Sequence, residues 1–290
     1  MNNNMKIPDS TKIQSAELRV KNLDKVFNFY SDMIGLKEIE RKDNTSFLSA
    51  NGKYPYLIKL VEDKNAVERP HNSTGLFHTA IRFPNRKELA RVFLRLFNHK
   101  YKFQGFSDHI VSEAIYLADP EGNGIELYAD RPREEWKWNN GQIEMATLPL
   151  DLSVLTNELD DRDVWNGAHP ATDIGHIHLN ISSLFKAEKV YNEIIGFNIT
   201  TASYPGALFL SAGGYHHHVG VNTWQSNKGT PPPENAAGLI SFTIKIDNAE
   251  YLKEIKSRAE AAGLTILPAG EDNPEGITIL DFDKTKIHLT

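Results

Sequence analysis

The sequence predicts an α+β protein made of four tandem modules, each with one strand, one helix and about three further strands. The chain repeats itself, because LRVKNLDKVFNFYSDMIGL (18–36) matches LNISSLFKAEKVYNEIIGF (179–197) at a constant offset of 161. Each copy begins with strand-like alternation, continues with helical periodicity and ends at a glycine, Gly35 or Gly196. A self-match of this length indicates an internal duplication.

A second, fainter repeat alternates with the copies of the first. The stretch GLFHTAIRFPNRKEL (75–89) matches GLISFTIKIDNAEYL (238–252), and DPEGNGIEL (119–127) matches DFDKTKIHL (281–289). The predicted modules therefore cover 12–62, 75–130, 174–224 and 237–290.

Along the sequence these modules fall into two groups, an N-terminal pair (1–130) and a C-terminal pair (174–290). A linker (131–173), which we expect to be partly helical, joins the two groups. The start of this linker, DRPREEW (130–136), fits either a lid over a substrate or a packed connector.

Composition excludes several classes of function. A net charge of −6 argues against nucleic acid as a partner. The N-terminus lacks a signal-peptide core, and no apolar run approaches the roughly 20 residues of a membrane helix, so a soluble cytoplasmic protein without a membrane partner is expected. The chain has no cysteine and eleven histidines, which leaves imidazole and carboxylate as metal ligands.

The duplicated modules differ where metal-binding chemistry could occur. His78 corresponds to Ser241, His176 to Ser15, and Glu126 to His288. The run His216-His217-His218 stands where the first module has Tyr54-Pro55-Tyr56. Polar side chains of this kind are therefore concentrated in the second and third modules.

The tandem modules, with GLFH (75–78) and GHIHL (175–179) opening two of them, resemble the vicinal oxygen chelate superfamily, which includes glyoxalase I, fosfomycin-resistance proteins and extradiol ring-cleaving dioxygenases. The stretch DHIVSEAIYLADPEGNGIELY (108–128) resembles the local signature of the extradiol dioxygenases. The one departure from that signature is Ser107, directly before this stretch. The resemblance covers all four modules and implies two half-open barrels.

The resemblance implies a metal site formed by His78, His176 and Glu126. Two histidines and one carboxylate on one face of the ion suit Fe(II), with Mn(II) as the alternative. His178 competes with His176 because the two lie on the same face of a strand. Aligning HIHL (176–179) with HTAI (78–81) favours His176 and leaves His178 beside the site.

The resemblance also assigns the catalytic residues. It implies that His217 is the acid–base group, that Tyr116 hydrogen-bonds a substrate oxygen, and that His109 lines the pocket. The histidine run reads as part of a strand, so alternation turns His216 and His218 to the face opposite to His217. The alternative is a solvated histidine cluster without a catalytic role.

Counting ligands predicts how the modules pair. Two modules form one barrel in this superfamily, and sequential pairing would separate His78 and Glu126 from His176. Pairing the second module with the third brings the three together and leaves the first module to pair with the fourth.

The expected function is therefore Fe(II)-dependent extradiol cleavage of a small aromatic diol by O₂, as in the degradation of aromatic compounds by catechol 2,3-dioxygenase-like enzymes. The alternatives are a glyoxalase-like or thiol-transferring metal enzyme, and a metal-free protein that binds an aromatic compound or an antibiotic. The sequence does not decide which ring substituents are accepted or whether the substrate is a hydroquinone. It also does not decide whether the chain forms a homo-oligomer.

Overall fold

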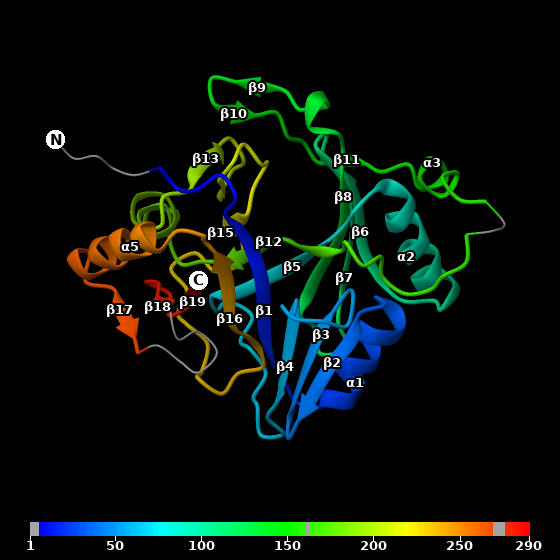
Figure 1. The fold of residues 1–290 in the computed structure, drawn as a ribbon, viewed down its shortest axis with the longest axis horizontal. Coiled ribbons are helices and arrows are strands. Elements are labelled where there is room, and N and C mark those ends of the chain that lie inside the picture. Colours follow the sequence, from blue (N-terminus) through cyan, green and yellow to red (C-terminus); the bar gives the residue numbers. More distant parts are fainter. Residues whose placement is uncertain (1–5, 161–162, 269–275) are drawn as a thin grey trace.

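The computed structural model describes residues 6–160, 163–268 and 276–290 (Figure 1). Each module consists of a strand, a helix and three strands, as predicted. The first contains β1 (Lys12–Val20), α1 (Leu23–Asn28) with η1 (Phe29–Met33), β2 (Lys37–Lys42), β3 (Thr45–Ser49) and β4 (Ile58–Glu62). The second contains β5 (Gly75–Phe83), α2 (Arg86–Asn98), β6 (Phe103–Asp108), β7 (Ser112–Ala118) and β8 (Gly124–Asp130).

The second half of the chain repeats this order after a connecting region. That region holds η2 (Arg133–Glu135), β9 (Trp138–Asn139), β10 (Gln142–Ile143), β11 (Leu148–Pro149) and α3 (Leu152–Thr156). The third module contains β12 (Asp173–Asn180), α4 (Leu184–Glu188) with η3 (Lys189–Ile194), β13 (Asn198–Thr201), β14 (Ala207–Ser211) and β15 (Val219–Asn222). The fourth contains β16 (Gly238–Lys245), α5 (Ala249–Ala261), β17 (Thr265–Leu267), β18 (Ile277–Leu280) and β19 (Lys286–Leu289).

The modules pair in two large sheets. A nine-stranded sheet has the order β11-β6-β7-β8-β5-β12-β15-β14-β13, so it joins the second module to the third. An eight-stranded sheet has the order β17-β18-β19-β16-β1-β4-β3-β2, so it joins the first module to the fourth. This confirms the pairing predicted from the ligand count and the α+β fold of tandem βαβββ modules.

Local sequence explains where the helices begin. Asn22, Asn85 and Asn248 stand before α1, α2 and α5, and each side chain accepts a hydrogen bond from a backbone N–H three residues later. This contact satisfies a donor that the first helical turn leaves unpaired. Ser183 takes the same place before α4 but makes no such bond.

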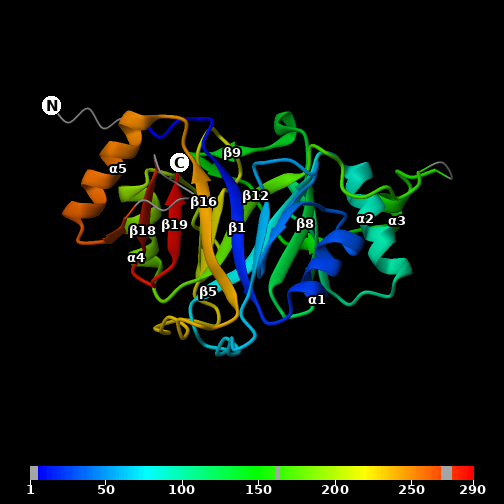
Figure 2. The same cartoon turned by 60° about the horizontal axis from the view of Figure 1, so that its bottom comes forward.

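The two sheets pack through their central strands, β1 against β12 and β16 against β5. In Figure 2, β1 and β16 run side by side through the middle of the molecule, with α5 and α2 near opposite ends. The apolar core lies between the sheets and their helices, where α2 packs on β8 and β5. No helix within the described ranges has the length and apolar character needed to cross a bilayer.

The core side of β12 should be essential for stability. Ile177 is fully buried in the apolar core, on the face of β12 opposite to His176 and His178. Ile177→Ala should lower the free energy of unfolding by about 2–5 kcal/mol, because it leaves a cavity in a packed core. Phe185→Ala, at a side chain that is 75% exposed, should change it by less than about 0.5 kcal/mol. Urea denaturation of both variants measures the difference, and equal losses would contradict this picture of the core.

Candidate metal centre and its cavity

Three neighbouring strands bring the predicted ligands together. His78 lies on β5, Glu126 on β8 and His176 on β12, and β5 is hydrogen-bonded to both other strands. In the β5–β12 ladder His78 is paired with His178, and a register shift in β12 follows Ile174. The nine-stranded sheet therefore unites side chains that are 98 positions apart in sequence.

The donor atoms of this triad form a compact triangle. His78 Nε2 lies 3.0 Å from Glu126 Oε2 and 3.3 Å from His176 Nε2, and His176 Nε2 lies 3.2 Å from Glu126 Oε2. Donors on one face of an octahedral ion, at bonds of about 2.1–2.2 Å, would be about 3.0 Å apart. The three side chains are buried, and among the described residues they are the one such group of histidines and acids. The arrangement fits a divalent cation of the first transition series.

The electrostatics of the triad suit metal binding. Burial lowers the pKa of His176 to about 4, so its imidazole is neutral and keeps a lone pair for a metal. Burial alone would raise the pKa of Glu126, but His176 and His78 hold that pKa well below its ordinary value. The buried site thus presents an ionised carboxylate and a neutral imidazole.

His178 faces a different partner. Its Nε2 accepts a hydrogen bond of 3.1 Å from the Asn222 amide, whose oxygen in turn accepts from the backbone N–H of Trp224. Gly220 leaves room for this ring, because a Cβ there would lie 3.0 Å from it. The nitrogen of His178 that could bind a metal is therefore engaged away from the triad.

His109 and Tyr116 form a hydrogen-bonded pair at the cavity wall. His109 Nδ1 lies 2.7 Å from the carbonyl oxygen of Ala146, so this nitrogen carries the proton. Nε2 of the same ring lies 2.6 Å from the Tyr116 hydroxyl, which also lies beside the Glu126 carboxylate. Ile110, in the turn after His109, has a φ of 71°, which is unusual for a β-branched residue. Asp108 holds that turn by accepting from the Ile110 N–H.

The run of three histidines does not lie in a strand. His216, His217 and His218 precede β15, after a turn in which Gly213 and Gly214 both have positive φ. Strand alternation therefore does not apply, and the prediction that His216 faces away from His217 is wrong. Instead, the Nδ1 atoms of His216 and His217 are 2.7 Å apart. His218 does turn away, packing on Phe197 and Tyr215.

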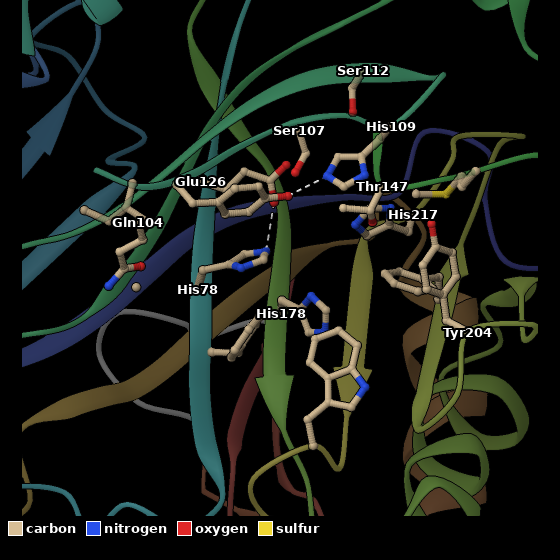
Figure 3. A pocket seen from close by; sticks show the side chains of 18 residues that line it. His78, Gln104, Ser107, His109, Ser112, Glu126, Thr147, His178, Tyr204 and His217 are labelled. Atoms are coloured by element: carbon tan, nitrogen blue, oxygen red, sulfur yellow. Dashed lines mark hydrogen bonds and ion pairs between the residues drawn. The ribbon is translucent and has the colours of Figure 1, made fainter. Parts of the chain in front are cut away.

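A cavity of about 360 Å³ lies beside the triad (Figure 3). Its lining includes His78 and Glu126 as well as His109, Tyr116 and His217. The rings of His217 and His176 are in contact, with centroids 4.0 Å apart, and burial holds the pKa of His217 well below the ordinary value. All the predicted catalytic residues thus line the cavity that His78 and Glu126 border, and the histidine run is buried and is not a solvated cluster.

Several wall residues were not identified from sequence. They are mostly apolar or aromatic and come from separate strands and loops: Phe77, Met145, Tyr204, Phe209 and Trp224. Met145 and Thr147 are the contribution of the connecting region, whereas Trp136 packs under Tyr215. Asp130 was also missed, although its place two and four residues after Tyr128 and Glu126 puts all three on one face of β8.

Comparisons with known proteins agree with this geometry. Residues 12–127 match the Glyoxalase/Bleomycin resistance protein/Dioxygenase superfamily. The chain is 42% identical to the catechol-2,3-dioxygenase of Bacillus subtilis (strain 168) over 90% of its own length and 91% of that protein. It is 25% identical to biphenyl-2,3-diol 1,2-dioxygenase 3 of Rhodococcus globerulus, over 43% of this chain and 68% of that one.

A solved structure supports the fold. Glyoxalase I from Zea mays superimposes with a TM-score of 0.60 at 15% identity, covering 97% of this chain and 92% of that one. At that identity the likeness concerns the fold alone. Since the match to the Bacillus subtilis enzyme extends over nearly the whole of both chains, this protein belongs to the glyoxalase/bleomycin resistance protein/dioxygenase superfamily.

Proposed function

We propose that this chain is an Fe(II)-dependent extradiol dioxygenase that opens the ring of a catechol beside its two hydroxyl groups. Mn(II) is the alternative metal. The observation that supports the proposal most is the convergence of His78, Glu126 and His176 beside an apolar cavity. Two imidazoles and one carboxylate on one face are the ligand set of non-haem Fe(II) oxygenases, and they leave positions open for other ligands.

In the proposed reaction one carbon–carbon bond of the ring breaks next to the diol, and both atoms of O₂ enter the product, a muconic semialdehyde. Bound Fe(II) would supply the redox chemistry that allows O₂ to react with the aromatic diol. The chain's own residues bind and orient the ring, exclude water and move protons. The aromatic walls, including Phe77, Phe209 and Trp224, suit a flat apolar ring.

His217 is the proton acceptor in this proposal. A catechol has to lose protons before it can chelate a metal, and the buried, neutral imidazole of His217 can accept one. The Tyr116 hydroxyl is hydrogen-bonded to His109, and its oxygen has lone pairs that can accept from a substrate hydroxyl. Because the His109 ring is fixed by the Ala146 carbonyl, this acceptor is held in place before the substrate binds.

The cavity walls favour an uncharged substrate. The described residues that line the cavity include neither lysine nor arginine, so a substrate carboxylate would lose its hydration without gaining a cation. A volume of about 360 Å³ corresponds to about twelve water-sized atoms, whereas catechol has eight non-hydrogen atoms. The space therefore admits catechol with a small apolar substituent.

Removing the anionic ligand should abolish metal binding. Glu126→Ala leaves two imidazoles and no carboxylate, so its affinity for the metal should fall by more than about tenfold, which is about 1.4 kcal/mol or more of binding free energy. The purified variant should therefore hold much less metal than the parent chain. Elemental analysis after anaerobic loading with Fe(II) measures this, and circular dichroism checks the fold. Glu144→Ala, at an exposed position of the connecting region, is the control and should retain the metal. Stoichiometric iron in Glu126→Ala would show that the ligand assignment is wrong.

Replacing His217 should separate binding from chemistry. His217→Gln should still bind iron and catechol under anaerobic conditions, while kcat for ring cleavage falls by about 10²–10⁴-fold, the usual contribution of an acid–base group. The yellow ring-cleavage product provides the assay. A variant with near-normal kcat would remove the acid–base role from this side chain.

Substrate charge should decide specificity. Catechol and 4-methylcatechol should be cleaved with similar kcat/KM, and 3,4-dihydroxybenzoate at least about tenfold less efficiently, because its carboxylate enters a wall without a cation. Oxygen uptake with the three compounds tests this. Equal efficiency for the carboxylated substrate would contradict the uncharged-substrate assignment while leaving the ring-cleavage proposal intact.

A further inference from the structure

A chain of buried polar groups leads from His217 away from the cavity. His217 Nδ1 lies 2.7 Å from His216 Nδ1, and His216 Nε2 lies 2.9 Å from Asp130 Oδ1. His216 is fully buried between the rings of Tyr215 and Trp136. The chain links the loop before β15 to the end of β8, across 86 positions of sequence.

Asp130 is anchored from two further sides. Its Oδ2 accepts from Arg82 at 3.1 Å, and the Tyr215 hydroxyl lies 3.0 Å from the same oxygen. Burial would raise the pKa of Asp130, but His216 and Arg82 lower it below the ordinary value, so the carboxylate is ionised. Arg82 is itself paired with Asp173 at 2.8 Å, which fixes its guanidinium near the end of β5.

Tyr128 supports the contact between Tyr215 and Asp130. Its hydroxyl lies 2.7 Å from that of Tyr215. The close approach of Tyr128 to β12 requires glycine at position 175, where a Cβ would lie 1.6 Å from the phenol oxygen. The polar chain is thus built from several elements and does not depend on one loop.

The direction of the hydrogen bonds follows from the carboxylate. An ionised Asp130 can only accept, so Nε2 of His216 carries a proton. If Nε2 carries the only proton of the His216 ring, Nδ1 of His216 accepts, and His217 then donates from its own Nδ1. Nε2 of His217 is left without a proton and has no hydrogen-bond partner within the described parts of the chain. That nitrogen is available to the cavity that His217 lines.

We propose that His216 and Asp130 are positioning residues, which hold the ring of His217 in the tautomer that presents an unprotonated Nε2 to the substrate. This inference rests on the proposed function of His217, because only a proton acceptor needs this tautomer. The orienting residue is the immediate neighbour of the residue it orients. The glycine turn makes this arrangement accessible, since in a strand the two side chains would face opposite sides.

Three variants separate positioning from packing. His216→Phe keeps a ring and removes both hydrogen bonds. His216→Asn places an amide oxygen where Nδ1 was, so His217 can still donate to it. His218→Asn is the matched control, because His218 is buried in the same loop but accepts from the backbone N–H of Ala212 and does not contact the cavity.

The first readout is independent of activity. Nitrogen-15 NMR of histidine-labelled full chain, loaded with diamagnetic Zn(II), reports which nitrogen of each ring carries the proton, and His217→Gln identifies the His217 signals. We expect His217 to be protonated at Nδ1 in the parent chain, in His216→Asn and in His218→Asn. In His216→Phe the signals should shift to a mixture of tautomers. An unchanged His217 tautomer in His216→Phe would overturn the inference, and so would a parent chain protonated at Nε2.

The second readout is the split between kcat and KM for catechol. His216→Phe should lower kcat by about 10–100-fold, the usual effect of losing a partner that orients a functional side chain, with KM within about twofold. His216→Asn should recover part of that loss, and His218→Asn should match the parent chain. Equal losses in His216→Phe and His218→Asn would show that the loop acts through packing alone. If the parent chain cleaves no catechol, the proposed function fails, while the NMR result still decides the tautomer.

Discussion

The backbone pairing of β5 with β12 is the constraint on which the rest of the site depends. Hydrogen-bonded strands hold neighbouring residues about 5 Å apart, so one ladder places His78 within reach of His176 although they belong to different modules. The parallel pairing of β5 with β8 adds Glu126 from the other side. A rigid sheet therefore fixes the donor atoms, and the loops around it need to supply only the substrate contacts.

The duplicated sheet shows that this backbone is not sufficient for a metal site. In the other sheet Glu17 pairs with Ser241 in the register that His178 and His78 occupy here. The scaffold is the same, but Ser15 and Ser241 stand where His176 and His78 would be. Their buried hydroxyls have no hydrogen-bond partner in the described chain. One sheet thus keeps the fold while the other also carries the polar groups.

The sequence predicted the parts of the site that depend on strand periodicity. Alternation put His176 and His178 on one face of their strand, the offset between repeats showed where the modules differ, and the family resemblance implied which of these residues are ligands. The sequence pattern could not place the histidine run. Gly213 and Gly214, both with positive φ, turn the chain at a point where the apolar pattern still continues. The bond between His216 and Asp130 was equally hidden, since tertiary packing alone brings together groups 86 positions apart.

Partners on neighbouring strands explain why buried charged groups do not destabilise the fold at this site. Glu126, Tyr128 and Asp130 follow one another on one face of β8, from the buried triad to the partly exposed edge. A buried charge without a partner would cost several kcal/mol, but both carboxylates here have partners on neighbouring strands. Those partners also fix hydrogen-bond directions, so the same contacts that offset the cost of burial set the orientation of the rings. An apolar replacement in this network would leave another polar group unpaired, and the network is therefore constrained as a unit.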